Sequence, residues 1–168
     1  MSTEQTREAT TQRSRWWEEA CAGFVATIPM TFFMLSTQRM LPRGQRYDLP
    51  PEMITRELAR RTHLRLRLTK KQLLAATLFS HFGYGTAIGA LYRPLKRRTP
   101  LPAPIKGTLF GLLIWLVSYL GLLPLLKIPA SAQQEPGRRN LMMILAHVVW
   151  GSTLGTLAAL PWPSHTRK

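Results

Sequence analysis

The sequence contains one cysteine, Cys21, and only 8 acidic residues in 168. A single cysteine excludes an intrachain disulfide and a cysteine-based metal cluster. Against the few acidic residues stand 23 lysines and arginines, which leaves a net charge of +15. On a short chain this surplus favours nucleic acid or anionic lipid as a partner. The sequence also lacks a nucleophile–base arrangement, a phosphate-binding loop and a metal-binding signature, so it predicts a protein that is not an enzyme.

The distribution of the basic residues favours lipid over nucleic acid. They are confined to the two tails and three connections, and the segments 17–40, 72–92, 107–126 and 140–160 are almost free of charge. A helix crosses a membrane with about 20 predominantly apolar residues. The first segment is the weakest, because threonines dilute it and Pro29 interrupts it, but membrane helices tolerate proline. We therefore predict an all-α integral membrane protein with four spans.

Two other interpretations of these segments are weaker. Four buried helices of a soluble bundle would each need a polar stripe, and segment 107–126 has none. A cleaved signal peptide at 17–40 would be shorter and would end in a clear small-residue cleavage site. The flanks also favour membrane helices, since aromatic residues gather at the segment ends. A capping box of Thr69 and Gln72 marks the start of the second span.

The second and fourth spans contain the same motif. His81 to Gly89 reads HFGYGTAIG and His147 to Gly155 reads HVVWGSTLG, so both follow H-x-x-aromatic-G-(S/T)-x-(I/L)-G. We therefore predict two tandem helical hairpins, one over 17–92 and one over 107–160. Because each hairpin has two spans, both copies keep the same orientation. The predicted fold is a four-helix bundle with a parallel pseudo-two-fold axis along the membrane normal.

The rest of the chain divides around the hairpins. Residues 1–15 form a polar basic tail, 41–71 a basic connection, 93–106 a proline-rich basic linker and 161–168 a C-terminal tail. Four spans place both termini on the same side of the membrane. The basic residues are spread almost evenly over the two sides, so the positive-inside rule does not choose the orientation.

The motif glycines predict where the spans pack. Gly85 and Gly89, like Gly151 and Gly155, are four apart and share a helix face with the histidine of their motif. Such faces let two backbones approach closely in a membrane. We predict that the second and fourth spans pack against each other through these glycines. A homodimer interface is the alternative.

His81 and His147 are the candidate functional residues, because ionisable side chains deep in a membrane point to function. The first interpretation is that each neutral ring hydrogen-bonds a neighbouring helix, with no cofactor. The second is that the pair binds a metal or haem. Haem meets an objection, since the glycines should hold the helices too close for a macrocycle. The third interpretation is a proton relay.

Glu18 and Glu19 open the first apolar segment. They could form a proton or cation site. A pair of interfacial carboxylates at a helix N-terminus is the simpler interpretation, since the helix dipole favours them there.

The basic connection is predicted to lie in the lipid headgroup layer. Pro50 and Pro51 start a short helix with proline at its first position, and LRLRL follows at 64–68. Interleaved apolar and basic residues suit anionic headgroups, whereas aromatic residues that would stack on nucleic-acid bases are lacking. The residues expected at the headgroups are Arg56, Arg60, Arg61, Arg65, Arg67, Lys70 and Lys71.

Four stretches carry a family resemblance: AGFVATIPMTFFML, LPP-x-x-I-T, HFGYGTAIGALY and AHVVWGSTLGTL. They resemble a group of uncharacterised small bacterial membrane proteins, the YagU-like inner-membrane family in the broad sense. The resemblance implies a bacterial inner membrane, four spans, no known enzyme activity and a link to acid resistance. The basic first connection is denser than that family implies.

Two classes of function follow from these observations. The preferred class is a non-enzymatic packing, stress-response or scaffold protein, alone or in a homo-oligomer or larger membrane complex. The alternative is a small transport, proton-relay or redox component that uses His81 and His147.

Overall fold

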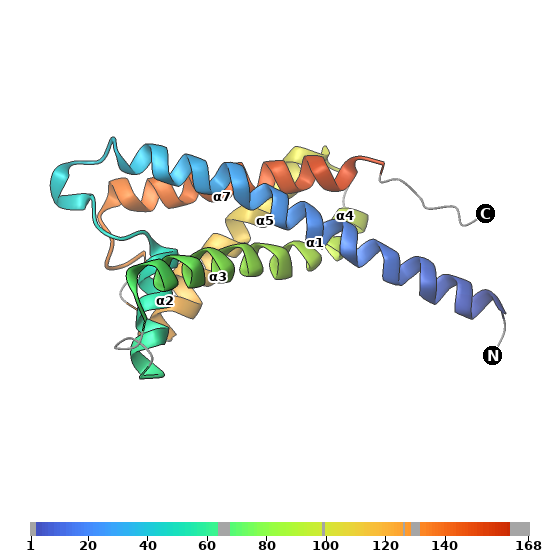
Figure 1. The fold of residues 1–168 in the computed structure, drawn as a ribbon. Helices are drawn as coiled ribbons and strands as arrows, with labels where there is room; N and C mark the ends of the chain where they lie inside the picture. Colours follow the sequence, from blue (N-terminus) through green and yellow to red (C-terminus); the bar gives the residue numbers. More distant parts are fainter. Residues whose placement is uncertain (1–2, 64–67, 99, 126, 129–131, 162–168) are drawn as a thin grey trace.

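The computed structural model describes residues 3–63, 68–98, 100–125, 127–128 and 132–161. This part of the chain consists of helices and loops, without a strand (Figure 1). Its helices are α1 Thr3–Gln38, α2 Pro50–Arg61, α3 Lys70–Ala90, α4 Arg93–Arg98, α5 Ala103–Leu116, α6 Leu123–Leu125 and α7 Gly137–Ala159. A 3-10 turn, η1 (Arg43–Gln45), precedes α2, and a π-helical segment, η3 (Val117–Leu122), joins α5 to α6.

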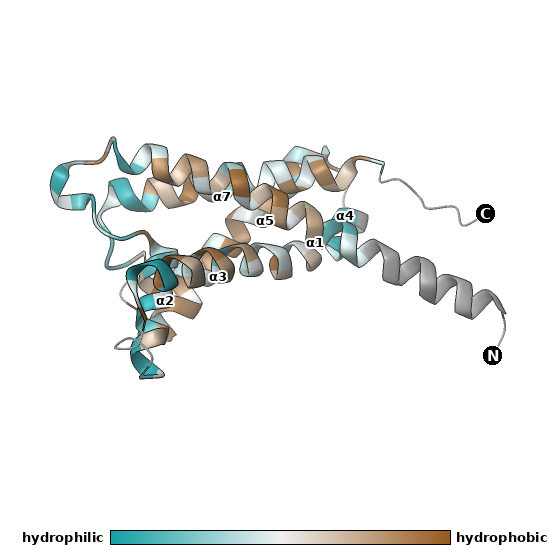
Figure 2. Ribbon diagram, in the orientation of Figure 1, coloured by the Kyte–Doolittle hydropathy of each residue, from teal (hydrophilic) through white to brown (hydrophobic). Residues whose placement is uncertain are grey.

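Three stretches are long and apolar enough to cross a membrane: Trp16–Gln38, Ala103–Leu125 and Gly137–Ala159. They correspond to the first, third and fourth predicted spans. Apolar residues occupy most of the length of these helices, and hydrophilic residues gather at the two ends of the molecule (Figure 2). The second predicted span is α3, which is not among these three stretches.

The helix boundaries follow several local signals that the sequence predicts. The capping box at the start of α3 is confirmed, since Gln72 N donates to Thr69 Oγ1 and Thr69 N donates to Gln72 Oε1, at 3.3 and 2.8 Å. The short helix that begins at Pro50 is confirmed as α2. Two boundaries differ from the prediction. α1 begins at Thr3, well before residue 17, and the third span is not a regular α-helix, because η3 interrupts it.

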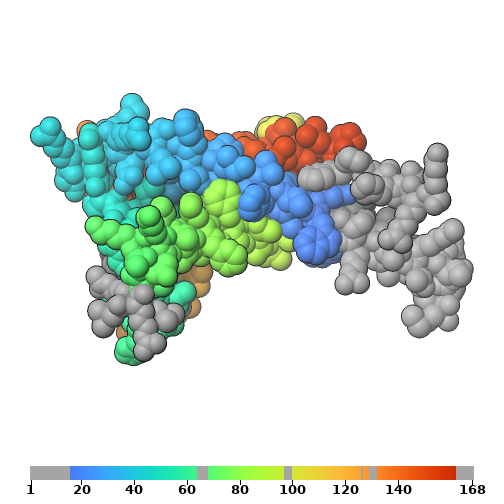
Figure 3. All heavy atoms as spheres, in the orientation of Figure 1, coloured from blue at the N-terminus to red at the C-terminus, as the bar shows by residue number. Residues whose placement is uncertain are grey.

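α1 packs on both α3 and α7, and α7 packs on both α1 and α5. The extensive helix contacts are those of α5 with α7, α1 with α3, α1 with α7 and α2 with α3. Figure 3 shows α1 and α3 side by side on one face. The prediction that the second and fourth spans pack directly against each other is therefore wrong, since α3 and α7 each pack on α1 instead.

Glycines make the closest of these contacts. A Cβ atom on Gly89 would lie 2.7 Å from Gly23 Cα in α1, and a Cβ atom on Gly107 in α5 would lie 2.8 Å from Gly155 Cα in α7. Real Cβ atoms do not come so close to backbone, so both contacts require glycine. The four motif glycines all lie at these contacts, Gly85 and Gly89 against α1 and Gly151 and Gly155 against α5.

A buried ion pair fixes one end of the molecule. Arg139, only 1% exposed, donates from Nε to Glu135 Oε2 at 2.6 Å. Its other nitrogens donate to the carbonyl oxygens of Gln45 and Asp48, both at 2.9 Å. The guanidinium also lies over the ring of Tyr47, 3.7 Å from its centre. The loop between α1 and α2 is thereby attached to the first turn of α7.

A second buried carboxylate lies near the opposite end. Glu19 Oε1 accepts from Lys96 Nζ at 3.3 Å, and Lys96 also donates to the carbonyl oxygen of Ala158. The explanation of Glu18 and Glu19 by the dipole at a helix N-terminus is wrong, because α1 extends upstream to Thr3.

Candidate functional site

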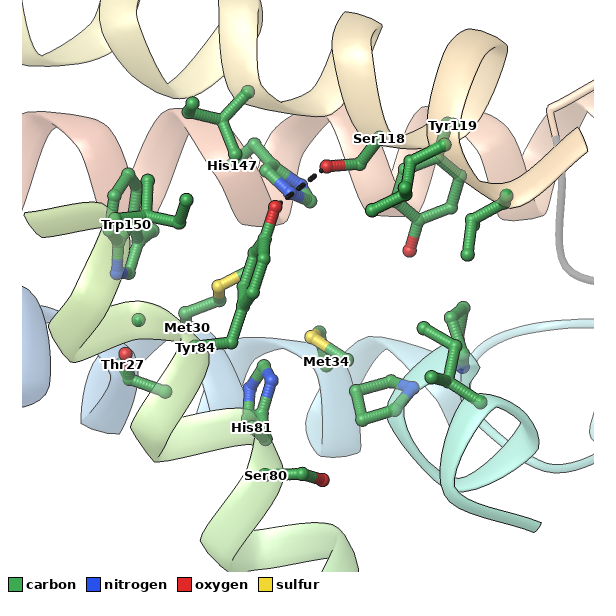
Figure 4. A pocket seen from close by; sticks show the side chains of 18 of the residues that line it. Thr27, Met30, Met34, Ser80, His81, Tyr84, Ser118, Tyr119, His147 and Trp150 are labelled. Carbon is green, nitrogen blue, oxygen red and sulfur yellow. Dashed lines mark hydrogen bonds between the residues drawn. The ribbon is translucent and has the colours of Figure 1, made fainter. Parts of the chain in front are cut away.

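A cavity of about 250 Å³, here called the central cavity, lies between α1, α2, α3, α5–η3 and α7 (Figure 4). The described residues that line it include none with a charged side chain. Its apolar walls come from Met30, Met34, Pro50, Pro51, Ile54, Ile88, Ile114, Leu122, Leu123, Ile128 and Trp150. Such walls suit an uncharged molecule, because an unpaired ion would lose its hydration without compensation.

Both motif histidines line the central cavity. His81 points into it from α3 and His147 points into it from α7 (Figure 4). The two rings occupy equivalent positions in the repeated motif. The structure therefore brings them to one space, although their helices do not pack extensively on each other.

His147 is oriented by its own helix. Its Nδ1 lies 2.8 Å from the carbonyl oxygen of Met143, one turn earlier. Because a carbonyl oxygen can only accept, Nδ1 carries the proton, and the neutral ring keeps Nε2 as an acceptor. The ring also packs edge-on against Tyr119, with 5.8 Å between the ring centres. The bond from this histidine is thus within α7 and not, as predicted, to a neighbouring helix.

His81 has a different environment. Its Nε2 is buried and has no hydrogen-bond partner among the described residues. The ring packs edge-on against Phe82, with 6.0 Å between centres. Buried polar atoms nearly always have a partner, which can be an ordered water or a ligand. His81 thus lines the cavity, and its Nε2 is a buried polar atom without a partner among the described residues.

The π-helical segment forms the wall that faces α3. It brings Ser118 and Tyr119 to the cavity, and Ser118 Oγ forms a hydrogen bond of 2.9 Å with the hydroxyl of Tyr84 (Figure 4). The backbone carbonyl of Tyr119 accepts from Ala132 N at 3.2 Å. Single π turns are rare and occur often at functional sites. Here the π-helical segment positions Ser118 for its hydrogen bond with Tyr84 across the cavity.

Other polar groups of the cavity bond within the protein. Thr27 Oγ1 and Trp150 Nε1 both donate to the carbonyl oxygen of Gly23, at 2.8 and 3.3 Å. Ser80 Oγ donates to the carbonyl oxygen of Thr77 at 3.0 Å. The two histidine rings and the hydroxyl of Tyr119 are then the main groups that a bound molecule could engage.

α2 covers one end of the central cavity. Pro50, Pro51 and Ile54 line the space, and Thr55 Oγ1 lies 3.0 Å from Ser80 Oγ of α3. The predicted headgroup segment is therefore also part of the cavity wall.

The arginines of α2 already have carboxylate partners. Arg60 and Arg61 both pair with Glu57, at 2.7 and 2.8 Å, and Arg56 pairs with Glu52 at 2.7 Å. Hydrogen bonds from Arg60 and Arg61 lower the pKa of Glu57 from 4.5 to about 2. The positive charge that these arginines could offer to lipid is thus partly neutralised within the helix.

The remaining predicted headgroup residues follow α2. Arg65 and Arg67 lie outside the described residues. Lys70 and Lys71 are exposed in the first turn of α3. The two lysines therefore support the predicted contact with lipid headgroups more directly than the arginines of α2.

No three His, Cys, Asp or Glu side chains within the described ranges are placed to hold a metal ion. Two imidazoles alone fall short of the three or four protein ligands of usual zinc sites. The geometric objection to haem assumed that the motif glycines hold α3 and α7 close together, and this assumption is wrong. The motif glycines draw α3 to α1 and α7 to α5, and they do not draw α3 to α7.

Sequence reasoning found the two histidines and missed most of their surroundings. Met30 and Met34 lie four apart on α1, which is a helix-face signal, but any apolar helix contains such pairs. Glu135 and Arg139 have the same spacing at the start of the fourth span. That spacing of opposite charges next to an apolar segment was the available signal for the buried ion pair.

Comparison with known proteins gives one result. A family model described as "Protein of unknown function (DUF1440)" matches residues 17–156. This range includes both copies of the motif and every residue that lines the central cavity. A search of the curated proteins and of the solved structures finds no match. Because the match covers most of the sequence, the chain belongs to the DUF1440 family of proteins of unknown function.

Proposed function

We propose that this chain is a non-enzymatic multi-pass membrane protein that binds a small molecule in the central cavity, with His81 and His147 as its polar contacts. The observation that carries the proposal is that the two repeated histidines, at equivalent positions of the motif, line one cavity whose described walls carry no charge. A packing or scaffold role, which the sequence favoured, explains the glycine contacts. It does not explain an uncharged cavity at the meeting point of the two motifs.

α3 is the fourth span in this proposal. Its 21 residues extend about 31 Å at 1.5 Å per residue, close to a hydrocarbon core of about 30 Å. In Figure 1 it runs from the end where α2 lies to the end where α4 lies, alongside α1. Leu74, Leu78 and Phe79 are exposed on its surface, as lipid-facing residues would be.

The paired glycine contacts support two tandem hairpins in a four-helix bundle. Gly23 meets Gly89 between α1 and α3, and Gly107 meets Gly155 between α5 and α7. Gly89 and Gly155, which make these contacts, occupy the same position in the two copies of the motif. A parallel pseudo-two-fold axis would relate the hairpins and pass close to the cavity between them.

A bacterial inner-membrane location and membership of the YagU-like group belong to the same proposal. α1 begins and α7 ends at the same end of the molecule (Figure 1), which supports termini on one side of the membrane. At the end where α2 lies, exposed Lys70 and Lys71 would contact anionic headgroups. A stress-response role, as the family resemblance implies, would act through the molecule bound in the cavity.

A metal-binding, redox or proton-relay role is the second candidate, because it would use the same histidine pair. Purified protein in detergent separates it from the first. A Soret band or a stoichiometric metal would contradict the small-molecule proposal and favour this second candidate, because the cavity would then be a cofactor site.

The test uses methionine methyl groups as reporters. Met30 and Met34 line the cavity, whereas Met40 is exposed at 83%. In protein labelled at the methionine methyls and held in lipid nanodiscs, toluene should shift the Met30 and Met34 signals in a saturable way. Met40 should respond only in proportion to toluene in the lipid. Ile114→Trp, which fills the cavity, is the control. Non-saturable shifts at all three methyls, or saturation that Ile114→Trp leaves unchanged, would refute the proposed function.

A further inference from the structure

We infer that the molecule bound in the central cavity is a neutral, mainly apolar compound with a hydroxyl group that donates a hydrogen bond to Nε2 of His147. This inference rests on the proposed function and names the chemical class of the ligand.

The absence of charged side chains among the described residues of the cavity wall indicates that the ligand is neutral. The described residues that line the cavity carry no lysine, arginine, aspartate or glutamate side chain. A charged ligand would therefore be buried without a counter-ion, which is costly inside a protein in a membrane.

The hydroxyl follows from the orientation of His147. Nδ1 is bonded to Met143 O at 2.8 Å, so the proton of the neutral ring is fixed on Nδ1. Nε2, at the opposite edge of the ring, can only accept a hydrogen bond. An ether, ketone or hydrocarbon has no proton to donate to it. An alcohol or a phenol does.

The size follows from the volume. An engineered apolar cavity of about 150 Å³ holds benzene, and the central cavity of about 250 Å³ is larger. It would hold one ring with several attached carbon atoms. Ile54, Ile88, Ile114 and Leu123 would contact this apolar part.

The experiment compares thymol with p-cymene, which has the same ring and alkyl groups but lacks the hydroxyl. Binding to full-length protein in lipid nanodiscs is followed through the Met30 and Met34 methyl signals. Thymol should bind about three- to tenfold more tightly than p-cymene, the effect of one neutral hydrogen bond. In His147→Phe the two compounds should bind equally. In His63→Phe, the same change at an exposed histidine outside the cavity, thymol should keep its advantage.

A second readout does not depend on the folding of a variant. In the wild-type protein, the ¹⁵N signal of His147 Nε2 should shift upfield with thymol and stay in place with p-cymene. Equal affinities for the two compounds, a static Nε2 signal, or an advantage kept in His147→Phe would overturn the inference while leaving the cavity as a binding site. Saturable binding of neither compound would refute the proposed function itself.

Discussion

Gly83 and Gly89 lie on the same helix, yet a methyl group would meet different surroundings at each. A Cβ on Gly89 would lie 2.6 Å from Glu19 O and 2.7 Å from Gly23 Cα, whereas a Cβ on Gly83 would meet nothing within 4 Å. Only the first glycine is required by a helix contact.

Gly89→Ala should therefore destabilise the protein by about 1–3 kcal/mol, the usual cost of overpacking. Gly83→Ala should be neutral or stabilising by up to about 1 kcal/mol, because alanine is the better helix former. Unfolding titrations in detergent would measure both. Similar losses for the two variants would show that the contact of α1 with α3 is not as described.

Arg139 provides the second prediction at this scale. Removing one partner of a buried ion pair typically costs about 3–5 kcal/mol, because the other charge stays buried and unpaired. Arg139→Met should fall in this range, since Glu135 would lose its ion-pair partner in a site that is 9% exposed. Adding Glu135→Gln to Arg139→Met should recover part of the loss in the same titration. Additive losses would contradict a coupled pair.

Residue identity predicted the site in part. The motif alone drew attention to His81 and His147, and both line the cavity. It could not show their surroundings, since Met30 and Tyr119 come from segments that carry no repeat signal. Nor could it show that the two glycine faces meet α1 and α5, because Gly23 and Gly107 lie in segments without the motif.

Among the elements, α2 differs most from its sequence-based interpretation. Its amphipathic and basic pattern predicted a helix at the headgroups, and the helix is present. Its arginines, however, bind carboxylates of their own helix, and its apolar side closes the central cavity. Ion pairing was not predicted, because spacing in the sequence allows such pairs without requiring them.

The titration of Glu57 tests this element. Its folded pKa is about 2, below its ordinary 4.5. The ion pairs with Arg60 and Arg61 should therefore be complete above about pH 4.5 and should be lost as the pH falls towards 2. The carboxyl ¹³C shift of Glu57 should titrate with a midpoint near 2, and Arg60→Gln/Arg61→Gln should return it towards 4.5. A midpoint near 4.5 in the wild type would show that the pairs do not persist.

η3 is the element that sequence periodicity could not predict. The segment from Gly107 to Leu126 is apolar on every side, so it has no polar stripe from which a change of register could be read. The π turn is evident only from the backbone of the structure, where it brings Ser118 and Tyr119 to the cavity.

At the scale of the whole molecule, the four-span proposal fixes the topology. Reporter fusions at residue 1 and at residue 168 should locate both termini on the same side of the membrane. A third fusion in the linker 93–106 should also report that side, because two spans lie between it and each terminus. Termini on opposite sides would show that α3 does not cross.

The confinement of the charges to the tails and connections predicted a helical membrane protein, and the pattern of apolar segments predicted where most helices lie. The arrangement of the helices was predicted wrongly, because identical glycine faces on the second and fourth spans suggested that they pair with each other. The motif glycines Gly89 and Gly155 instead contact Gly23 and Gly107, on the two spans that lack the motif. A small residue allows a close helix contact but does not identify the partner helix. The pairing of the helices could therefore not be predicted from one sequence.

Disulfide cross-linking tests the arrangement of the helices most directly. A Cβ on Gly85 would lie 3.4 Å from Thr27 Cβ, close to the 3.5–4.5 Å between the Cβ atoms of a disulfide. In a Cys21→Ser background, Thr27→Cys/Gly85→Cys should cross-link within one chain on mild oxidation, and Gly85→Cys/Gly151→Cys should not. This result would locate α1 against α3, the arrangement that opens the central cavity to both histidines. Cross-linking of the second pair and not of the first would contradict the account.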